Sequence, residues 1–512
     1  MQGDQENIEF TAVKRENRRL TEEVAQLKLD LHQLEVMLRL QQRQRFSTSS
    51  ERHVDQLNLF PNLASGDLIA KTSEEDDVDI KGHKRRKKKR PTIPANLPRE
   101  TVHHDLPESD KVCPQHGTPL EKNGETKTTQ VEYVPAKIKV VDHICATYGC
   151  PVCNETVKAA EPPPSPIPGS IATPSLLAQI ATAKFADGLP LYRQEGILAR
   201  AGIELTRTTM ATWMGRLATM LAPLTNLFND VLLEGFVIYM DETHLQVLNV
   251  PDKAATSKSY LWVRVGGILG QEVVLFHFDP SRSGDIPLNV LEGFKGFVTT
   301  DDYSGYNRIE GVDGIRRLQC WMHIRRYFKK ATKALGKAGK GGIADQALSR
   351  IRKLYMLERE CADFPAEDRR RFRLEHEKPL LDAFESWLRT ALEDVPPKSA
   401  TGKAIAHALK TWRYLIVYLE DGRLKMDNGP AENAIRPVAV GRKNWLFSST
   451  VEGAEATATL YSVIETAKVH GLDPYAYLCR VIERLTVAKT IEDVEALLPW
   501  NIVKMQAAPS LH

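Results

Sequence analysis

The stretch GFVIYMDETHLQVL, residues 235–248, sets the fold of the middle of the chain. It is an apolar run of strand type that arrives at Asp241, where DETH indicates a strand end. Strand, strand, helix, strand and short strand patterns follow in that order: SYLWVRVGG (259–267), EVVLFHFD (272–279), DIPLNVLEGF (285–294), GFVTTDDYSGYN (296–307) and RRLQC (316–320). This order predicts an α/β core in which acids carried by separate strands of one sheet converge.

Three acidic residues are candidates for a metal site in this core. Asp241 and Asp301 follow strand patterns, and Glu432 lies in MDNGPAENAIRPVAVGRKNWLFSS, residues 426–449. Phosphoryl transfer between nucleic-acid strands uses two divalent ions about 4 Å apart, one at the attacking oxygen and one at the leaving oxygen. Mg²⁺ prefers carboxylate oxygens and water. We therefore predict an RNase H-like catalytic core in which Asp241, an acid of the pair Asp301 and Asp302, and Glu432 bind Mg²⁺ or Mn²⁺.

Each acid also has a structural interpretation. Asp241, Asp301 and Asp302 could belong to turns, where aspartate is common. The Gly-Pro pair before Glu432 marks a helix start, so this glutamate would offset the helix dipole and pair with Arg436 four residues later. Taken together, the acids favour the catalytic interpretation, because strand patterns precede both aspartates and a helix start precedes the glutamate.

Basic residues near these acids are candidate phosphate contacts. They are Arg436, Arg442 and Lys443 around Glu432, and Arg325 and Arg326 in WMHIRRYF, with His323 as a further phosphate or metal-proximal group. The alternative is a satisfied histidine and solvated arginines. A separate block, KGHKRRKKKR at 81–90, has eight Lys or Arg in ten positions and predicts a polyanion-binding segment or a solvated linker. Its candidate DNA contacts are Lys84, Arg85, Arg86, Lys87, Lys88, Lys89 and Arg90.

Cysteine spacing predicts a structural zinc site. Cys113 and His116 have C-x2-H spacing, and Cys150 and Cys153 have C-x2-C spacing. Two such pairs separated by short strands can supply four tetrahedral ligands, and the metal would then stabilise a small β-rich module. His143 and Cys145 are spare candidates, and unmetallated thiols are the alternative.

The N-terminal segment has the pattern of a coiled coil. Phe10, Asn17, Val24, Leu31 and Leu38 recur every seven residues, and Val13, Leu20, Leu27 and Leu34 form a second series. This alternating spacing predicts a dimer or higher oligomer, with Asn17 at a register-setting position. A single amphipathic helix docked on its own chain is the alternative.

Residues 191–217 have the layout of a helix-turn-helix. A helical pattern leads to a turn at Ala201 and Gly202, and Thr206 is a suitable N-cap for a second helix. Arg207 would then lie in the exposed first turn of a helix that could enter a major groove. An ordinary helical hairpin has the same pattern.

Composition limits the broad class. A chain of 512 residues predicts two to four domains, and 42% hydrophobic with 26% charged residues is typical of a globular protein. No apolar run is long enough to cross a bilayer, and the N-terminus lacks signal-peptide features, so we expect no membrane partner and a cytoplasmic location. Seven cysteines in this length argue against a disulfide scaffold.

These segments together resemble the insertion-sequence-66 family of bacterial DDE transposases. The resemblance covers nearly the full length, including YMDETHLQV, TTDDYSGYN, QCWMHIRRYF and, most specifically, AENAIRPVAVGRKNWLFSSTVEGAEATATLYSVIETAKVHGLDPYAYL. By motif it implies Asp241, Asp301 and Glu432 as the three acids, a helical insertion before the third, and accessory proteins from the same element. Two positions depart from the family pattern: Asp302 replaces the usual glycine, and His116 replaces the usual cysteine.

We expect the following segments: a coiled-coil oligomerisation helix (1–45), a linker with the basic block (46–100), a zinc-binding module (101–160), a helical DNA-binding region (161–230), an RNase H-like core (231–328 and 427–475), a helical insertion (329–426) and a C-terminal helical tail (476–512). The expected function is metal-dependent cutting of DNA at element ends and joining of the freed 3′-OH to target DNA. The alternatives are a non-catalytic dimeric DNA-binding regulator and an RNase H-like nuclease that does not join DNA.

Overall fold

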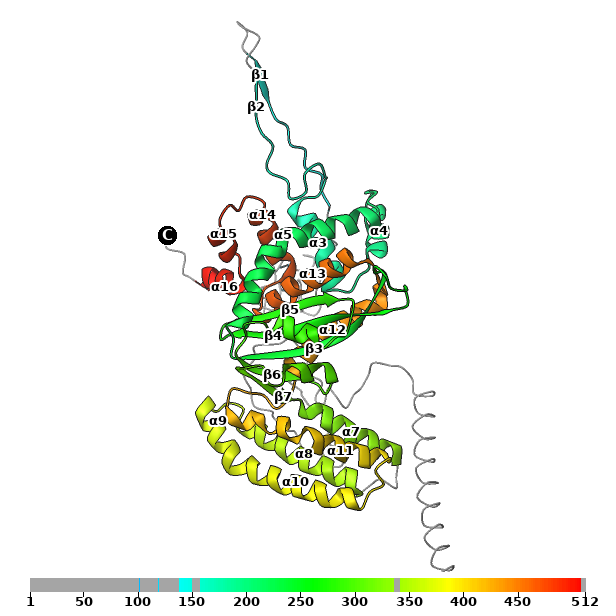
Figure 1. Cartoon of the computed structure of the whole chain (residues 1–512). Helices are drawn as coiled ribbons and strands as arrows, with labels where there is room; N and C mark the ends of the chain where they lie inside the picture. The colour runs from blue at the N-terminus through cyan, green and yellow to red at the C-terminus, as the bar shows by residue number, and fades with distance from the viewer. Residues whose placement is uncertain (1–100, 102–117, 119–137, 150–156, 336–340, 508–512) are drawn as a thin grey trace, which may run out of the picture. The chain divides into compact units, whose positions relative to one another are not determined.

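The computed structural model describes residues 101, 118, 138–149, 157–335 and 341–507 (Figure 1). The predicted coiled coil, the basic block and the four predicted zinc ligands lie outside these residues. The chain divides into two compact units, residues 48–140 and the remainder, and all described helices and strands belong to the latter.

The first described elements are a short hairpin and three helices. They are β1 (Thr147–Gly149), β2 (Val157–Ala159), α3 (Pro174–Phe185), α4 (Leu191–Arg200) and α5 (Arg207–Leu233). The predicted helix-turn-helix layout is present: the turn after α4 contains Gly202 at φ +84°, a left-handed conformation that glycine adopts without steric cost. The hydroxyl of Thr206 accepts a hydrogen bond from the backbone N–H of Thr209 at 3.2 Å and caps α5. Beyond its exposed first turn, α5 has a buried apolar side along most of its length.

A mixed sheet forms the centre of the molecule. Its strands are β3 (Val237–Asn249), β4 (Lys258–Ile268), β5 (Gln271–Asp279), β6 (Gly296–Thr300) and β7 (Ile315–Gln319), in the spatial order β5-β4-β3-β6-β7. β3, β4 and β5 pair antiparallel, whereas β6 pairs parallel with β3 and with β7. Helix α6 (Asp285–Val290) lies between β5 and β6, and the 3-10 helix η2 (Ser304–Ile309) follows β6. All five predicted strands are present, but β3 continues eight residues past Asp241, so the strand end expected at DETH is not there.

The edge strand β5 is covered by helix α13 (Val451–Val469). The hydroxyl of Ser462 accepts a hydrogen bond from the N–H of Phe276 at 2.8 Å, and that of Thr466 accepts from the N–H of Val274 at 3.1 Å. Thr466 also donates to the Val274 carbonyl at 3.0 Å. Because an exposed strand edge invites pairing with another chain, these buried hydroxyls satisfy the edge and block it.

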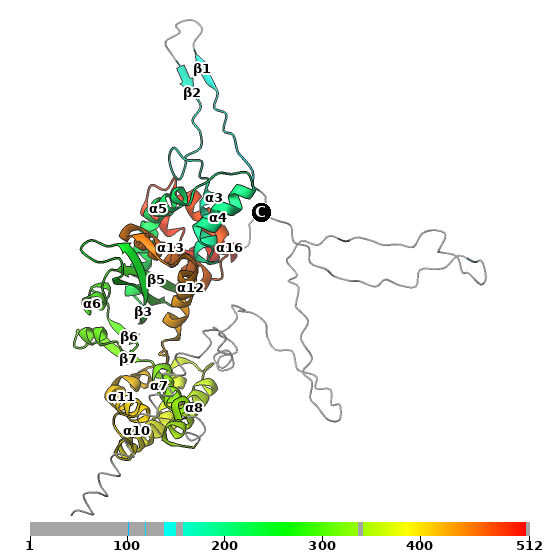
Figure 2. The ribbon, with the colours of Figure 1, turned by 90° about the vertical axis from the view of Figure 1, so that its right-hand side faces the viewer.

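The described residues between β7 and α12 form helices with their own hydrophobic core, here called the insertion. They are α7 (Trp321–Leu335), α8 (Ile343–Glu360), α9 (Ala366–Phe372), the π-helix η4 (Arg373–Glu377), α10 (Lys378–Glu393), α11 (Ala400–Leu415) and η5 (Val417–Glu420). The insertion lies beyond β7, and α3, α5, α13 and α14 gather near β5 (Figures 1 and 2).

The chain then returns to the sheet. The remaining elements are α12 (Gly429–Trp445), β8 (Ser448–Thr450), α14 (Pro474–Leu485), α15 (Ile491–Glu495) and α16 (Pro499–Ala507), with α13 between β8 and α14. β8 pairs parallel with the distal end of β3, a pairing that the sequence patterns do not predict. Among the described helices, none combines the length and apolarity needed to span a membrane.

Candidate active site

Strand pairing places Asp241 and Asp301 side by side. The parallel register of β3 and β6 joins Tyr239 to Thr299, and each aspartate lies two residues beyond its member of that pair. Side chains two residues apart share a sheet face, so both carboxylates emerge on the same side. Burial, followed by the charges of Glu242 and Asp301 and then of Glu432, raises the pKa of Asp241 well above its usual range.

Glu432 is brought to the same place by the residues just before α12. The side-chain amide of Asn428 donates to the Met240 carbonyl at 2.7 Å, which fixes the start of α12 against the residue preceding Asp241. The backbone N–H of Asn428 donates to Sγ of Cys320 at 3.1 Å. Asn428 is fully buried, so these bonds join β3, the end of β7 and α12 in a dry environment.

Asp427 extends this junction to the insertion. Its Oδ1 accepts hydrogen bonds from the N–H of Met322 at 2.9 Å and from the hydroxyl of Tyr355 at 2.7 Å. A carboxylate at the first turn of α7 pairs with N–H groups that the helix leaves unbonded. Burial raises the pKa of Asp427 to about 6. The insertion and α12 are therefore fixed to each other one turn before Glu432.

The partners of Glu432 come from α7. Nδ1 of His323 lies 3.6 Å from Oε1 of Glu432, and Nη2 of Arg326 lies 3.5 Å from Oε2. Within the described chain, Glu432 makes these two ion pairs. The pair with Arg436 expected from the structural interpretation of Glu432 is not among them. Sγ of Cys320, a ring nitrogen of His323 and a Glu432 oxygen lie within 4.8 Å of one another.

Asp302 is engaged by partners outside this cluster. Its Oδ1 accepts from the side-chain amide of Gln319 at 3.0 Å, and its Oδ2 lies 3.1 Å from Nδ1 of His407 on α11. Within the described part of the chain, the carboxylate of Asp301 accepts one hydrogen bond, from the backbone N–H of Tyr303 at 2.9 Å. The geometry therefore favours Asp301 over Asp302 as the second metal-binding acid.

Glu242 is a buried acid that the sequence analysis did not single out. Arg282 forms an ion pair with it, and the hydroxyl of Tyr306 donates to its Oε2 at 2.6 Å. Burial and the charge of Asp301 raise its pKa. Because Arg282 and Tyr306 already occupy its oxygens, we assign Glu242 a supporting position beside Asp241 and not a metal-binding one. In the sequence, the only signal for Glu242 is its position next to Asp241.

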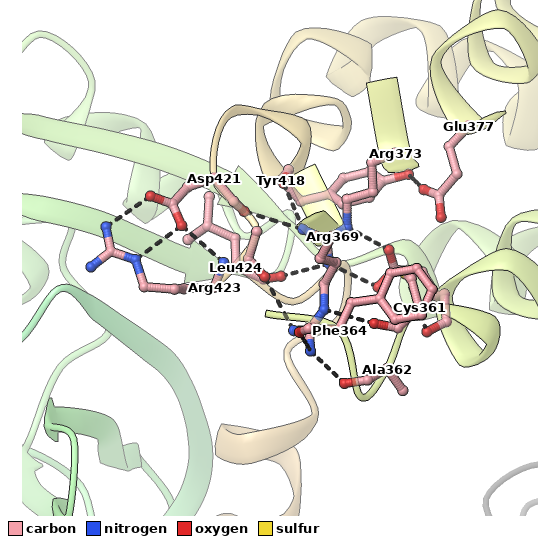
Figure 3. Close-up of polar contacts among 12 residues, drawn as sticks. Cys361, Ala362, Phe364, Arg369, Arg373, Glu377, Tyr418, Asp421, Arg423 and Leu424 are labelled. Atoms are coloured by element: carbon pink, nitrogen blue, oxygen red, sulfur yellow. Dashed lines mark hydrogen bonds and ion pairs between the residues drawn. The ribbon is translucent and has the colours of Figure 1, made fainter. Parts of the chain in front are cut away.

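Two arginines hold the segment that leads from the insertion to α12 (Figure 3). Arg373 pairs with Glu358 through Nε at 2.6 Å and Nη2 at 2.9 Å, and it also donates to three carbonyls, those of residues 418, 421 and 424. Arg369 donates to the Gly422 carbonyl at 3.1 Å. Planar guanidinium groups can hold several acceptors at once, so they fix this loop's path toward Glu432.

The predicted DNA contacts differ in their exposure to solvent and in their hydrogen bonds. Arg207, Arg326, Arg436 and Lys443 are exposed, and Arg325 is partly exposed. Arg442 instead donates to Oγ1 of Thr243 at 2.7 Å and to the His244 carbonyl, which anchors α12 on β3. Two further acids close to this segment, Glu452 and Glu455, are exposed in the first turns of α13.

The donor set fits hard divalent cations. Asp241, Asp301 and Glu432 present carboxylate oxygens close enough for their charges to disfavour ionisation of Asp241. Mg²⁺ or Mn²⁺ would offset that repulsion, because such ions take carboxylate oxygens and water. The arrangement is suited to chemistry on a phosphodiester, whose transition state gains negative charge.

Family models match most of the chain. The family described as Transposase IS66 family matches residues 169–456, and the IS66 C-terminal element matches residues 462–500. The zinc-finger binding domain of transposase IS66 matches residues 110–154, which supports structural zinc, and a family described as Transposase C of IS166 homeodomain matches residues 33–102.

Relatives from Sinorhizobium fredii align over most of their length. The uncharacterized protein y4jD is 34% identical over 80% of this chain and 81% of its own, and y4qI is 33% identical over 74% and 71%. A third, y4hP, is 28% identical over 95% of this chain and 90% of its own. The family matches together cover nearly the whole sequence and imply DNA as a partner. The chain belongs to the IS66 family of transposases.

Proposed function

We propose that this chain is a DDE-type enzyme that cuts DNA at the ends of an insertion sequence and joins the freed 3′-OH to target DNA. One observation carries the proposal: Asn428 bonds α12 to the residue before Asp241, while strand register sets Asp301 beside it. These contacts, with the charges of Asp301 and Glu432 that act on Asp241, support a site built from three acids up to 191 positions apart, 432 against 241.

The fold part of the proposal is an RNase H-like core. The sheet order β5-β4-β3-β6-β7, with three antiparallel strands followed by two parallel ones, supports it. We propose that residues 231–328 and 427–475 form this core and that residues 329–426 interrupt it, so that α7, the first helix of the insertion, begins in the core segment. We also propose that the coiled coil at 1–45 is an oligomerisation helix. We further propose that accessory proteins encoded by the same element are partners of this chain.

In the proposed mechanism the protein positions the reacting groups and balances their charge. Bound divalent ions would activate the attacking oxygen and stabilise the leaving oxygen. Asp241, Asp301 and Glu432 would hold those ions. Arg326 helps to hold Glu432 in place through their 3.5 Å contact. Water first attacks the phosphodiester at the element end and breaks its P–O3′ bond, which leaves a free 3′-OH and a 5′-phosphate. That 3′-OH then attacks a target phosphodiester, and the 3′-oxygen of the target strand leaves as the new P–O bond forms.

A strand-transfer assay tests this function. Full-length protein is incubated with labelled duplex carrying an element end, a target duplex, and Mg²⁺ or Mn²⁺. We expect nicked end DNA and a longer joined product, both absent in EDTA. Binding with no cleavage would indicate a DNA-binding regulator, and cleavage with no joined product would indicate a nuclease.

A second prediction concerns the zinc module. We propose Cys113, His116, Cys150 and Cys153 as ligands of one structural zinc, so elemental analysis should find about one zinc per chain. Cys150→Ala should lose that zinc and become sensitive to proteolysis within residues 101–160, because the metal supplies much of the folding free energy of such a module. Cys479→Ala, in α14, is the matched control and should keep its zinc. A zinc-free wild-type protein with full activity would refute the site.

A further inference from the structure

Helices α7 and α11 of the insertion carry charge of one sign. α7 contains five Lys or Arg and α11 contains three, and neither helix contains Asp or Glu. The other long helices of the bundle mix both signs, with four basic and three acidic residues in α8 and two basic and three acidic in α10. Mixed charge is usual on a bundle surface, so the single sign on these two helices points to a polyanionic partner.

The two helices pack antiparallel and form a defined surface. The rings of Trp321 and Trp412 lie 5.6 Å apart, and those of Tyr327 and His407 lie 4.5 Å apart, so later positions on α7 meet earlier ones on α11. Lys330 on α7 and Lys403 and Lys410 on α11 are exposed. None of these three lysines forms an ion pair with another residue in the described part of the chain. We call Tyr327, Lys330, Lys403, His407 and Lys410 the α7/α11 seam.

The seam begins at the acid cluster. His407 contacts Asp302 at 3.1 Å, and Arg326, one residue before Tyr327, contacts Glu432 at 3.5 Å. From Lys403 to Lys410, α11 extends about 10 Å, at 1.5 Å per residue. Duplex DNA advances about 3.4 Å per base pair, so the seam matches roughly three base pairs. Its cations are therefore placed to follow one DNA strand outward from the site of cutting.

We propose that the α7/α11 seam binds the phosphate backbone of duplex DNA next to the scissile phosphate. This rests on the proposed function, since it uses the acid cluster as the point of cutting. The seam holds the duplex through backbone charge, which fixes position without reading sequence. The insertion then has two roles, fixing Glu432 from one side and holding the DNA that Glu432 acts on.

The test uses full-length protein and a duplex carrying an element end. Replacing Lys330, Lys403 and Lys410 together with Gln should weaken binding about tenfold or more at moderate salt. It should also lower the slope of log K against log salt by about 2 to 3, because each lost phosphate contact removes about 0.9. The control variant changes Arg352, Lys353 and Lys378 to Gln, an equal charge loss from exposed positions on α8 and α10, and its slope should remain near that of wild type.

A crosslinking experiment gives the position of the DNA. A photoreactive side chain at Lys330 should crosslink within about three base pairs of the element end in the duplex, whereas one at Lys353 should not. Equal slopes for the two triple variants, or crosslinks from Lys330 only to distant DNA, would overturn the seam. Both readouts measure binding, so failure of the wild-type chain to cleave DNA would overturn the proposed function alone.

Discussion

Asp241→Asn is expected to reduce metal-dependent DNA cleavage by about 10³-fold or more while leaving DNA binding unchanged. Loss of one carboxylate removes a ligand from ions that carry the transition-state charge, and a 10³-fold loss corresponds to about 4 kcal/mol of activation free energy. In EDTA the same variant should melt at or above the wild-type temperature. The folded protein buries this carboxylate beside those of Glu242, Asp301 and Glu432, and the amide removes that repulsion.

Asp301→Asn and Glu432→Gln should lose cleavage to a similar degree. In the proposed site both residues contribute carboxylate oxygens to the metal ions, and the variants are nearly isosteric with wild type. The measurement is the single-turnover cleavage rate at saturating protein, which separates chemistry from binding. A binding isotherm on the same duplex shows whether the variants still hold DNA.

Asp302→Asn and Glu455→Gln are the matched controls for these acids. Asp302 is engaged by Gln319 and His407, and Glu455 is exposed on α13, so cleavage should fall by less than about tenfold. Wild-type rates in any of the three proposed variants would remove that residue from the mechanism. A larger loss in Asp302→Asn than in Asp301→Asn would reverse their assignment.

The strands and the two aspartates could be predicted because local sequence determines them. Apolar runs of strand length mark β3 to β7, and parallel pairing of β3 with β6 then places Asp241 beside Asp301. Glu432 could be predicted as a helix-start acid, but its approach to the aspartates depends on Asn428 and Asp427. Nothing in MDNGP itself shows that these two side chains bond to β3 and to the insertion.

Other features were beyond prediction because distant residues create them. Ser462 and Thr466 resemble ordinary polar interruptions of an apolar helix, yet they satisfy an edge strand nearly 190 positions earlier. Arg442 resembles a DNA contact by its basic neighbourhood, yet its guanidinium bonds to Thr243 on β3. The length of β3 was underestimated, because the polar residues DETH are half-buried within a continuing strand that β4 pairs on one side.

Arg373→Met is expected to destabilise the insertion by about 3–5 kcal/mol, because it leaves a buried charge and several carbonyls without a partner. Arg373 is 1% exposed and bonds Glu358 with two nitrogens. The thermal midpoint should fall by about 10 °C, with proteolysis appearing first in residues 341–426. Lys at this position keeps the charge but lacks the planar fork, so Arg373→Lys should recover only part of the loss. A midpoint unchanged in Arg373→Met would contradict the role assigned to this network.

Glu377 lies in the same network, so the stability of the insertion should depend on pH. Burial and the charge of Glu358 raise the pKa of Glu377 to about 8, and its Oε2 accepts a hydrogen bond from Tyr418 at 2.5 Å. An unfolded glutamate has a pKa of about 4.3, so between that pH and about 8 the folded state holds a proton that the unfolded state has released. The stability of the wild-type insertion should therefore fall as pH rises from about 5 to 8 and level off above. Glu377→Gln mimics the protonated form and should lose this part of the slope, so its midpoint relative to wild type should rise across that range. Parallel pH profiles for the two proteins would show that Glu377 is ionised in the fold, and Arg373 would then balance two carboxylates instead of one.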